Sequence, residues 1–166
     1  HGGETSVTLA LSPDGTVALS VGTPDIGGSR ASMCLMAAEE LGIPYEKVRT
    51  TVVDTASLGY NDVSHGSRVT YASGLATIKA ARDAKKKLCA RAAKIWGIDE
   101  DAVEWEDGHA KPSSPNAGEF EPLSFQRLCR IMGRTGGPIS GHYEATPEGA
   151  GVSFATHIVD AEVDPE

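Results

Sequence analysis

The sequence lacks two features that would have indicated a membrane protein or a nucleic-acid-binding protein. It has no apolar run long enough to cross a bilayer, so it predicts no membrane span. It also has no excess of positive charge, because 15 Lys and Arg stand against 23 Asp and Glu and give a formal net charge of −8. This acidic balance argues against nucleic acid and anionic membrane surfaces as partners.

Cysteine is scarce and unpaired in the sequence. The three cysteines, Cys34, Cys89 and Cys129, are odd in number and far apart, and no Cys-x-x-Cys pair exists. We therefore predict no zinc ribbon or iron–sulfur site within the chain, and the histidines show no metal-ligand spacing either. Three free thiols are typical of a reducing compartment, so we expect a cytoplasmic protein.

Several catalytic motifs are also missing. The sequence contains neither a P-loop, nor the three-glycine dinucleotide fingerprint, nor the Gly-x-Ser-x-Gly elbow of hydrolases. Asp25, Asp54 and Asp62 lie near glycine-rich loops, but turns and strand ends use aspartate routinely. The sequence therefore assigns no catalytic residue and no metal ligand.

Glycine, by contrast, is abundant, with 19 residues, and one glycine-rich stretch organises the chain. It lies between a strand-like run ending at Val21 and a helix-like run over 31–41. Gly27 and Gly28 allow a tight turn or a close ligand, Ser29 is a suitable N-cap, and Arg30 adds a positive charge. A helix start of this kind suits an anion such as phosphate.

A second loop, residues 56–67, repeats this chemistry. It ends in Gly66 and Ser67 and is followed by Arg68 at the start of a long helical pattern. We expect Ser29 and Ser67 to lie at helix starts that approach one cleft, where both loops bind a single anionic ligand. The alternative is two ordinary helix caps with exposed arginines, and the residues alone leave both interpretations open.

The hydrophobic periodicity predicts an α+β domain. Alternation and turn residues predict strands at Thr5–Leu11, Val17–Val21, Val48–Val53, Val103–Glu106, His109–Lys111, Ile139–Thr146 and Val152–Val163. Apolar stripes at three- and four-residue steps predict helices at Ala31–Leu41, Arg68–Trp96 and a short one after Ser124. We expect a two-layer sandwich: a mixed sheet that starts with a β-hairpin, carries further strands, and is covered by two main helices, one of them long.

Length and composition favour one domain over residues 1–166, with 40% hydrophobic and 23% charged residues. The chain opens at His1 without methionine and stops at Glu166, directly after a strand-like run. We interpret it as a fragment of a larger subunit.

The loop sequences resemble the xanthine dehydrogenase/aldehyde oxidase family. The resemblance is to the molybdopterin-binding region of its large catalytic subunit, which is also the large subunit of aerobic carbon monoxide dehydrogenases. It covers essentially the whole chain, in order. The segments that carry it are Gly22-Thr-Pro-Asp-Ile-Gly-Gly-Ser, Ala37-Ala-Glu-Glu-Leu-Gly-Ile-Pro, Val53-Asp-Thr, Gly66-Ser-Arg and Val159-Asp-Ala-Glu-Val-Asp-Pro-Glu.

The resemblance implies a molybdenum hydroxylase, in which the loops hold molybdopterin, often as its cytosine dinucleotide. It implies Gly27, Gly28, Ser29 and Arg30 as the first cofactor loop, and Gly66, Ser67 and Arg68 as the second. It further implies a small-molecule substrate and three kinds of partner: the rest of the catalytic subunit, and iron–sulfur and flavin subunits or domains.

One position departs from the family pattern. The first loop of the family reads Gly-Gln-Gly, and Gly28 cannot supply the glutamine amide. The family's glutamate base lies beyond Glu166 and further loops precede His1, so we expect the isolated fragment to be inactive and to hold no cofactor. The alternative is a degenerate relative that serves as a non-catalytic phosphate- or nucleotide-binding module.

Overall fold

The computed structural model of the chain describes residues 3–51, 54–113, 115–146, 148–149, 151 and 155–164. Its main sheet has the strand order β3-β2-β1-β7, in which only the β2–β3 pair is parallel. The strands of this sheet are β1 (Thr5–Leu11), β2 (Val17–Val21), β3 (Val48–Thr50) and β7 (Ser140–Ala145).

The first two strands form the predicted hairpin. Every second residue of β1 and β2 is buried, and Leu9 lies opposite Leu19 in the antiparallel register. In the turn, the Asp14 carboxylate accepts a hydrogen bond from the Thr16 backbone N–H at 2.9 Å, and Gly15 has a φ of +79°, which favours glycine. The alternating burial and the turn residues therefore both account for the hairpin.

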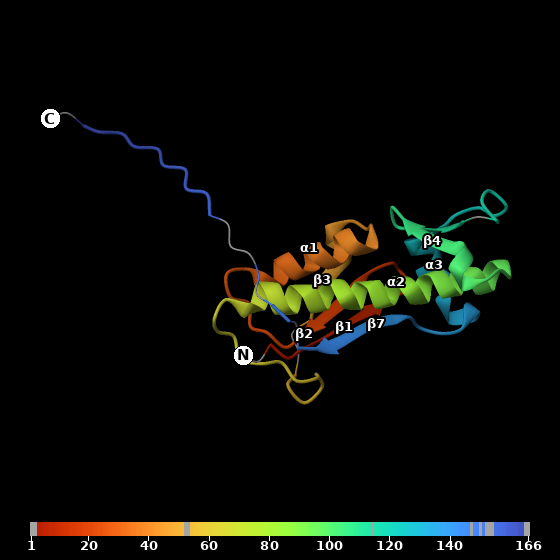
Figure 1. Cartoon of the computed structure of the whole chain (residues 1–166), viewed down its shortest axis with the longest axis horizontal. Helices are drawn as coiled ribbons and strands as arrows, with labels where there is room; N and C mark the ends of the chain where they lie inside the picture. Colours follow the sequence, from red (N-terminus) through yellow and green to blue (C-terminus); the bar gives the residue numbers. More distant parts are fainter. Residues whose placement is uncertain are drawn as a thin grey trace.

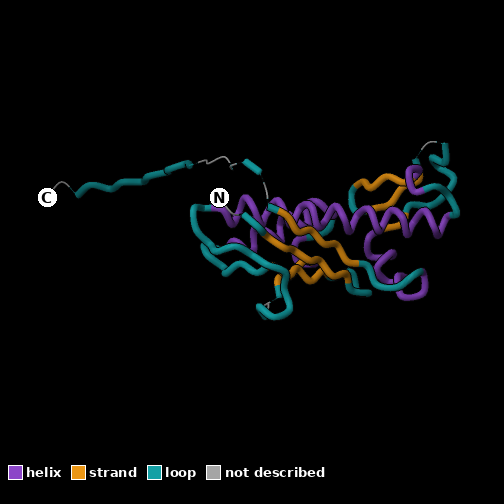
Figure 2. The backbone as a smooth tube through the Cα atoms, turned by 60° about the horizontal axis from the view of Figure 1, so that its bottom comes forward, coloured by secondary structure: helices purple, strands orange, loops and turns teal. Residues whose placement is uncertain are grey.

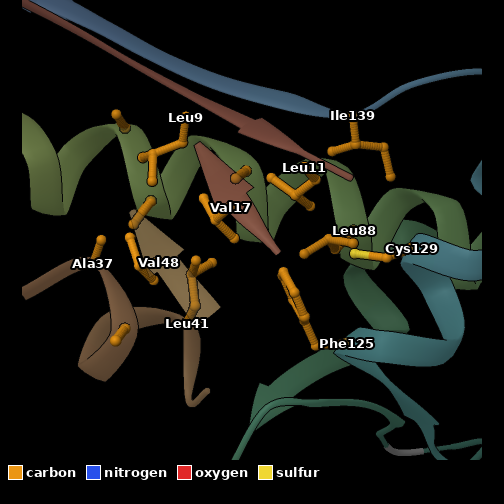
Figure 3. Packing of buried hydrophobic residues seen from close by; sticks show 14 of the residues in the cluster. Leu9, Leu11, Val17, Ala37, Leu41, Val48, Leu88, Phe125, Cys129 and Ile139 are labelled. Carbon is orange, nitrogen blue, oxygen red and sulfur yellow. The ribbon is translucent and has the colours of Figure 1, made fainter. Parts of the chain in front are cut away.

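Two helices, α1 (Ser29–Leu41) and the long α2 (Gly74–Trp96), cover one face of the main sheet (Figure 1). Small side chains let α2 lie close to the strands: Ala76, Ala80 and Ala84 are fully buried, and Gly141 of β7 has no room for a β-carbon against Ala80. The close view in Figure 3 shows side chains from the sheet and both helices, such as Leu9 and Ala37, meeting in one apolar core.

A smaller sheet lies beside the C-terminal part of α2 (Figure 2). Trp105 of the smaller sheet contacts α1 by donating its indole N–H to the Leu41 carbonyl at 3.0 Å. Its strand order is β4-β5-β6, and its elements are β4 (Val103–Glu106), β5 (His109–Pro112), β6 (Leu123–Ser124) and the helix α3 (Phe125–Thr135). Short helical turns complete the chain at η1 (Tyr45–Lys47), η2 (Val69–Ser73) and η3 (Glu100–Ala102).

The predicted α+β class, with a hairpin start and two main helices packed on a sheet, is confirmed. Several boundaries differ, and β5 and β7 do so by one residue at an end. The first helix begins at Ser29 rather than Ala31, and the long helix opens with the π-helical turn η2. The strand expected to reach Val53 ends at Thr50, and its last two residues lie outside the described part of the chain.

The strand predicted over 152–163 is wrong where the structure describes it. Residues 155–164 form no strand and extend away from the rest of the molecule (Figure 1). Ile158, Val159 and Val163 are 92%, 84% and 82% exposed. The alternating pattern is present, but a strand also needs a neighbour for its ladder of hydrogen bonds. No described strand of this chain pairs with the segment.

In the described part of the chain, no helix combines the length and the apolar character needed to cross a membrane.

Candidate functional site

The first glycine loop joins β2 to α1. Gly27 and Gly28 have φ values of +61° and +74°, in the left-handed region, and Gly28 is the N-cap of α1. A β-carbon built at either glycine meets nothing within 4 Å. Glycine is therefore favoured at these two positions by the backbone conformation, because the surrounding protein would leave room for a β-carbon. The loop has open space at its surface.

Ser29 is not the helix cap that we predicted. It is the first residue of α1, it is buried, and its hydroxyl donates to the Pro24 carbonyl at 3.4 Å. The cap lies one residue earlier because the left-handed Gly28 already turns the chain into the helix. The serine hydroxyl consequently stabilises the inside of the loop rather than the N–H groups at the start of α1.

Arg30 holds the first loop through the backbone. Its Nε and Nη2 donate to the Thr23 carbonyl at 3.3 and 3.1 Å. Its own backbone N–H donates to the Asp25 carboxylate at 3.0 Å, which places a negative charge at the N-terminus of α1. Asp25 was not assigned a role from the sequence. Aspartate shortly before a helical stripe is a signal for such a contact, although not a specific one.

The second glycine loop precedes the π-helical turn η2. Gly66 and Ser67 both have a φ of +57°, and Ser67 is one of two described residues other than glycine in the left-handed region. Arg68 follows as the N-cap of η2. Ser29 and Ser67 therefore both lie at helix starts, as expected. The strained backbone at Ser67 is of the kind that clusters at ligand-binding sites.

Arg68 fastens the second loop to the beginning of β1. Its Nη1 donates to the Asp62 carbonyl at 2.9 Å, and its Nη2 donates to the carbonyls of Gly3 and Glu4 at 3.1 and 3.0 Å. These three bonds use three of the four N–H groups on the two terminal nitrogens. The Nε atom is buried and has no hydrogen-bond partner.

Asn61 connects the two loops. Its side-chain oxygen accepts from the Thr5 hydroxyl at 2.8 Å, and its amide nitrogen donates to the Gly59 carbonyl at 3.1 Å. The same side chain fills the space beside Gly22, where a built β-carbon would lie 2.6 Å from the amide nitrogen. The sequence analysis missed this residue, because a lone asparagine in a loop carries no specific signal.

Residues of both loops line one cavity of about 340 Å³, which we call the loop cavity. Ile26 of the first loop and Ser29 at the start of α1 line it on one side. The other lining residues are Ser64, His65 and Ser67 of the second loop and Arg68, Val69 and Thr70 at the start of η2. Of the predicted site residues, Ser29, Ser67 and Arg68 meet here, and Gly66 lines the neighbouring cavity. Gly27 and Gly28 line neither cavity, and Arg30 lines a separate hollow with Cys34 and Arg49.

Unpartnered polar atoms gather at the two loops. Among the described residues, three buried side-chain atoms have no hydrogen-bond partner: Thr23 Oγ1, Ser64 Oγ and Arg68 Nε. Thr23 and Ser64 lie in the two loops, Arg68 directly follows the second one, and Ser64 and Arg68 line the loop cavity. Orphaned buried polar groups are rare in folded proteins and point to a missing partner. A hydroxyl and a guanidinium N–H are donors, so the missing partner fits an acceptor such as an oxyanion.

The thiols lie apart from this chemistry. Burial raises the pKa of the Cys34 and Cys89 thiols, and it raises the pKa of Cys129 to about 12, so all three stay protonated at neutral pH. None of them lines the loop cavity. Within the described ranges, no group of three His, Cys, Asp or Glu residues is placed to hold a metal ion.

Residues at both glycine loops line one cavity, and two of its lining residues, Ser64 and Arg68, carry unpartnered donor atoms. Comparison with known proteins identifies the family. The molybdopterin cofactor-binding domain family matches residues 1–166, so the chain belongs to this family. The resemblance that the loop sequences carry is confirmed.

Two curated relatives illustrate the match. The chain is 32% identical to the carbon monoxide dehydrogenase large chain of Afipia carboxidovorans over 102 residues, or 61% of this chain. It is 28% identical to the nicotine 6-hydroxylase large subunit of Paenarthrobacter nicotinovorans over 106 residues, or 63% of this chain. Each match spans 13% of the relative. Both relatives are enzyme subunits by name, so the alternative of a non-catalytic binding module finds no support.

Solved structures share the fold. Carbon monoxide dehydrogenase from Oligotropha carboxidovorans superposes with a TM-score of 0.77 at 24% identity, covering 86% of this chain and 18% of that one. Quinoline 2-oxidoreductase from Pseudomonas putida 86 gives a TM-score of 0.71 at 17% identity, covering 87% and 19%. At these identities the likeness shows the fold, and it confirms the predicted fold class.

Proposed function

We propose that this chain is a single cofactor-binding domain, residues 1–166, within the large catalytic subunit of a molybdenum hydroxylase. The observation that carries the proposal is the loop cavity, where both predicted loops meet and where Ser64 Oγ and Arg68 Nε lack partners. Such a cavity suits the anionic part of a molybdopterin cofactor. The family match over the whole chain supports the same assignment.

The site residues divide into two groups by what they do. We assign Ser64, Ser67 and the Arg68 Nε to contact with the anion, and the start of η2, which leads into α2, adds positive partial charge. Gly27 and Gly28 shape the first loop through their left-handed backbone, and Gly66 keeps part of the wall of the neighbouring cavity free of a side chain. Ser29 and Arg30 hold the first loop in shape through the carbonyls of Pro24 and Thr23.

When bound, the molybdenum–pterin group supplies the redox centre at which a water-derived oxygen is inserted at a carbon atom of the substrate. The described residues contribute binding and orientation. The cytosine dinucleotide form of the cofactor is part of the proposal, because the cavity shared by the two loops suits a phosphate group. The proposed partners are the rest of the catalytic subunit, iron–sulfur and flavin units, and a small-molecule substrate, in the cytoplasm.

Gly66→Ala in the subunit that contains this chain tests the proposal. Gly66 has a φ of +57° and open space at its β-carbon, and Gly97 at the C-terminal end of α2 has a φ of +72° and equally open space. Gly97→Ala is therefore a control with matched backbone strain. We expect Gly66→Ala to lower the molybdenum and pterin content of the purified subunit, and Gly97→Ala to leave both unchanged. Equal contents in the two variants would refute the cofactor role of the second loop.

A further inference from the structure

We infer that Thr5, which lies at the start of β1 and does not line the loop cavity, is a positioning residue for the proposed anion site. Its hydroxyl holds both ends of the segment 61–73, and the middle of this segment forms part of the cavity wall. The inference rests on the proposed function, since it assigns a role at the same site to a residue outside its wall. No sequence motif pointed to Thr5.

Thr5 is the polar member of an apolar row. Alternate side chains of a strand share one face, and in β1 the row on the core side consists of Thr5, Val7, Leu9 and Leu11. The first three of these are completely buried. A buried hydroxyl costs free energy unless it is hydrogen-bonded, and valine would fill the same space without that cost. The partners of the hydroxyl therefore indicate why a threonine occupies this position.

The Thr5 hydroxyl joins two parts of the chain. It donates to the Asn61 side-chain oxygen at 2.8 Å, and it lies 3.3 Å from the Ser73 hydroxyl. Because a threonine hydroxyl has a single hydrogen, which Asn61 receives, Ser73 is the donor in the second bond. Ser73 is also completely buried. One hydroxyl thus connects the second loop to the last residue of η2.

These two contacts flank the wall of the loop cavity. The lining residues that the second loop and η2 supply all fall within 64–70, between Asn61 and Ser73. Holding both ends of a segment restricts the conformations that are open to its middle. The position of the wall relative to β1 is therefore coupled to the Thr5 hydroxyl.

A second buried hydroxyl supports the end of the π-helical turn. Turns of this kind are rare and are frequent at functional sites. Ser73, the last residue of η2, is held from two sides: its hydroxyl donates to Thr5, and its carbonyl accepts from the Thr77 hydroxyl at 2.8 Å. Thr77 is completely buried as well. Buried hydroxyls therefore fix the point at which η2 passes into α2.

The neighbour of Thr5 holds the same loop through its backbone. The Glu4 carbonyl accepts from the Asp62 backbone N–H at 2.9 Å and from Arg68 Nη2 at 3.0 Å. Both bonds end on a main-chain atom, so a substitution at Thr5 does not remove them. The side chain of Thr5 is therefore a position at which the placement of the wall can be tested while the anchor of Arg68 is kept.

The experiment titrates the 166-residue chain with pyrophosphate and follows amide chemical shifts by NMR, which gives both the affinity and the location of binding. In the unaltered chain we expect the Ser67 and Thr70 amides to shift. Thr5→Val keeps the shape of the side chain but removes both hydrogen bonds, and it should weaken pyrophosphate binding about tenfold. Thr5→Ser restores the hydroxyl and should bind within about threefold of the unaltered chain.

Thr135→Val is the matched control. The Thr135 hydroxyl likewise donates and accepts, to the Ile131 carbonyl at 3.0 Å and from Arg91 Nη1 at 3.1 Å, but it lies in α3 and does not line the loop cavity. Thr135→Val should therefore lower the melting temperature and leave pyrophosphate affinity unchanged. If Thr5→Val does not fold, Ser73→Ala, which removes the donor to Thr5, replaces it.

Two sets of outcomes separate the inference from the proposed function. Pyrophosphate binding to Thr5→Val that is less than about threefold weaker, or no weaker than in Thr135→Val, would overturn the inference and leave the anion site intact. A loss that Thr5→Ser does not restore would overturn it too. Absence of binding to the unaltered chain, or shifts confined to residues outside the loop cavity, would refute the proposed anion site and the inference with it.

Discussion

Replacing Arg68 separates two roles that one arginine could have at the second loop. The structure shows Arg68 fastening the loop to the start of β1 through three backbone carbonyls. Our proposal adds that its unpartnered Nε faces the ligand. Arg68→Ala removes both contributions, whereas Arg68→Lys keeps the charge but cannot reproduce the planar fork that reaches three acceptors.

The stability cost follows from the contacts. Hydrogen bonds to a charged donor contribute about 1.5–3 kcal/mol each when protected from water. Two of the three bonds of Arg68 are partly buried and one is exposed, so we discount the sum to about 2–3 kcal/mol for solvent screening. A domain of this size loses about 2–4 °C per kcal/mol. We therefore expect Arg68→Ala to lower the melting temperature by about 5–10 °C.

Circular dichroism melts of the chain provide the measurement, and Arg82→Ala provides the control. Arg82 is 56% exposed and pairs with Glu40, which keeps Lys85 as a partner, so its loss should cost less than about 1 kcal/mol. Pyrophosphate titration separates the roles further. If the geometry of the loop dominates, Arg68→Lys and Arg68→Ala should weaken pyrophosphate binding equally. If the charge dominates, Arg68→Lys should retain the binding that Arg68→Ala loses. A melting temperature for Arg68→Ala within about 2 °C of the unaltered chain would refute the fastening role.

Three further predictions concern other parts of the chain. Gly28→Gln has room for its side chain, but the new residue must adopt a φ of +74°, so the free energy of unfolding measured by chemical denaturation should fall by about 1–2 kcal/mol. Gly118→Gln, at a φ of +81° with equally open space, should show the same loss. An unchanged free energy of unfolding in both variants would contradict this prediction. Burial raises the pKa of Cys129 to about 12, so the folded chain holds a proton that the unfolded chain releases above pH 9. The free energy of unfolding should then fall by about 1.4 kcal/mol per pH unit between pH 9 and 12, less so in Cys129→Ala. Finally, the exposed Ile158, Val159 and Val163 should make the chain self-associate, and sedimentation should show a monomer once residues 155–166 are deleted; a monomer before deletion would contradict this.

Local patterns were sufficient to predict the hairpin, the two main helices and the position of a Gly-Ser sequence at or next to the start of each helix. Each of these depends on residues within a few positions of one another, such as Asp14 and Gly15 in the first turn. The partners of Arg68 could not be predicted in this way, because Gly3 and Glu4 precede it by more than 60 residues. The same holds for Asn61, which is paired with Thr5 only once β1 and the loop lie side by side.

The strand expected over 152–163 shows a different limit. Apolar and polar residues alternate over 159–163 as they do in a strand, yet residues 155–164 pair with no described strand. Alternation reports that a segment can present one apolar face, and the hydrogen-bonding partner has to be supplied by another part of the structure. The pattern therefore describes the segment alone, and the prediction was wrong because it assumed that a neighbouring strand was present to pair with it.

The two arginines of the site show how the structure changes the chemistry expected from the sequence. Arg30 and Arg68 were each predicted as cations for an anionic ligand, and each in fact donates guanidinium N–H groups to backbone carbonyls. An arginine that donates several guanidinium N–H groups to backbone carbonyls fixes the loop shape first and contributes its charge at longer range. The groups left to contact a ligand directly are then the small ones: the hydroxyls of Ser64 and Ser67, the Arg68 Nε and the backbone around the glycines. Recognition at this site would thus depend on loop geometry more than on the number of cations, and for that reason the Arg68→Lys variant is the most informative substitution.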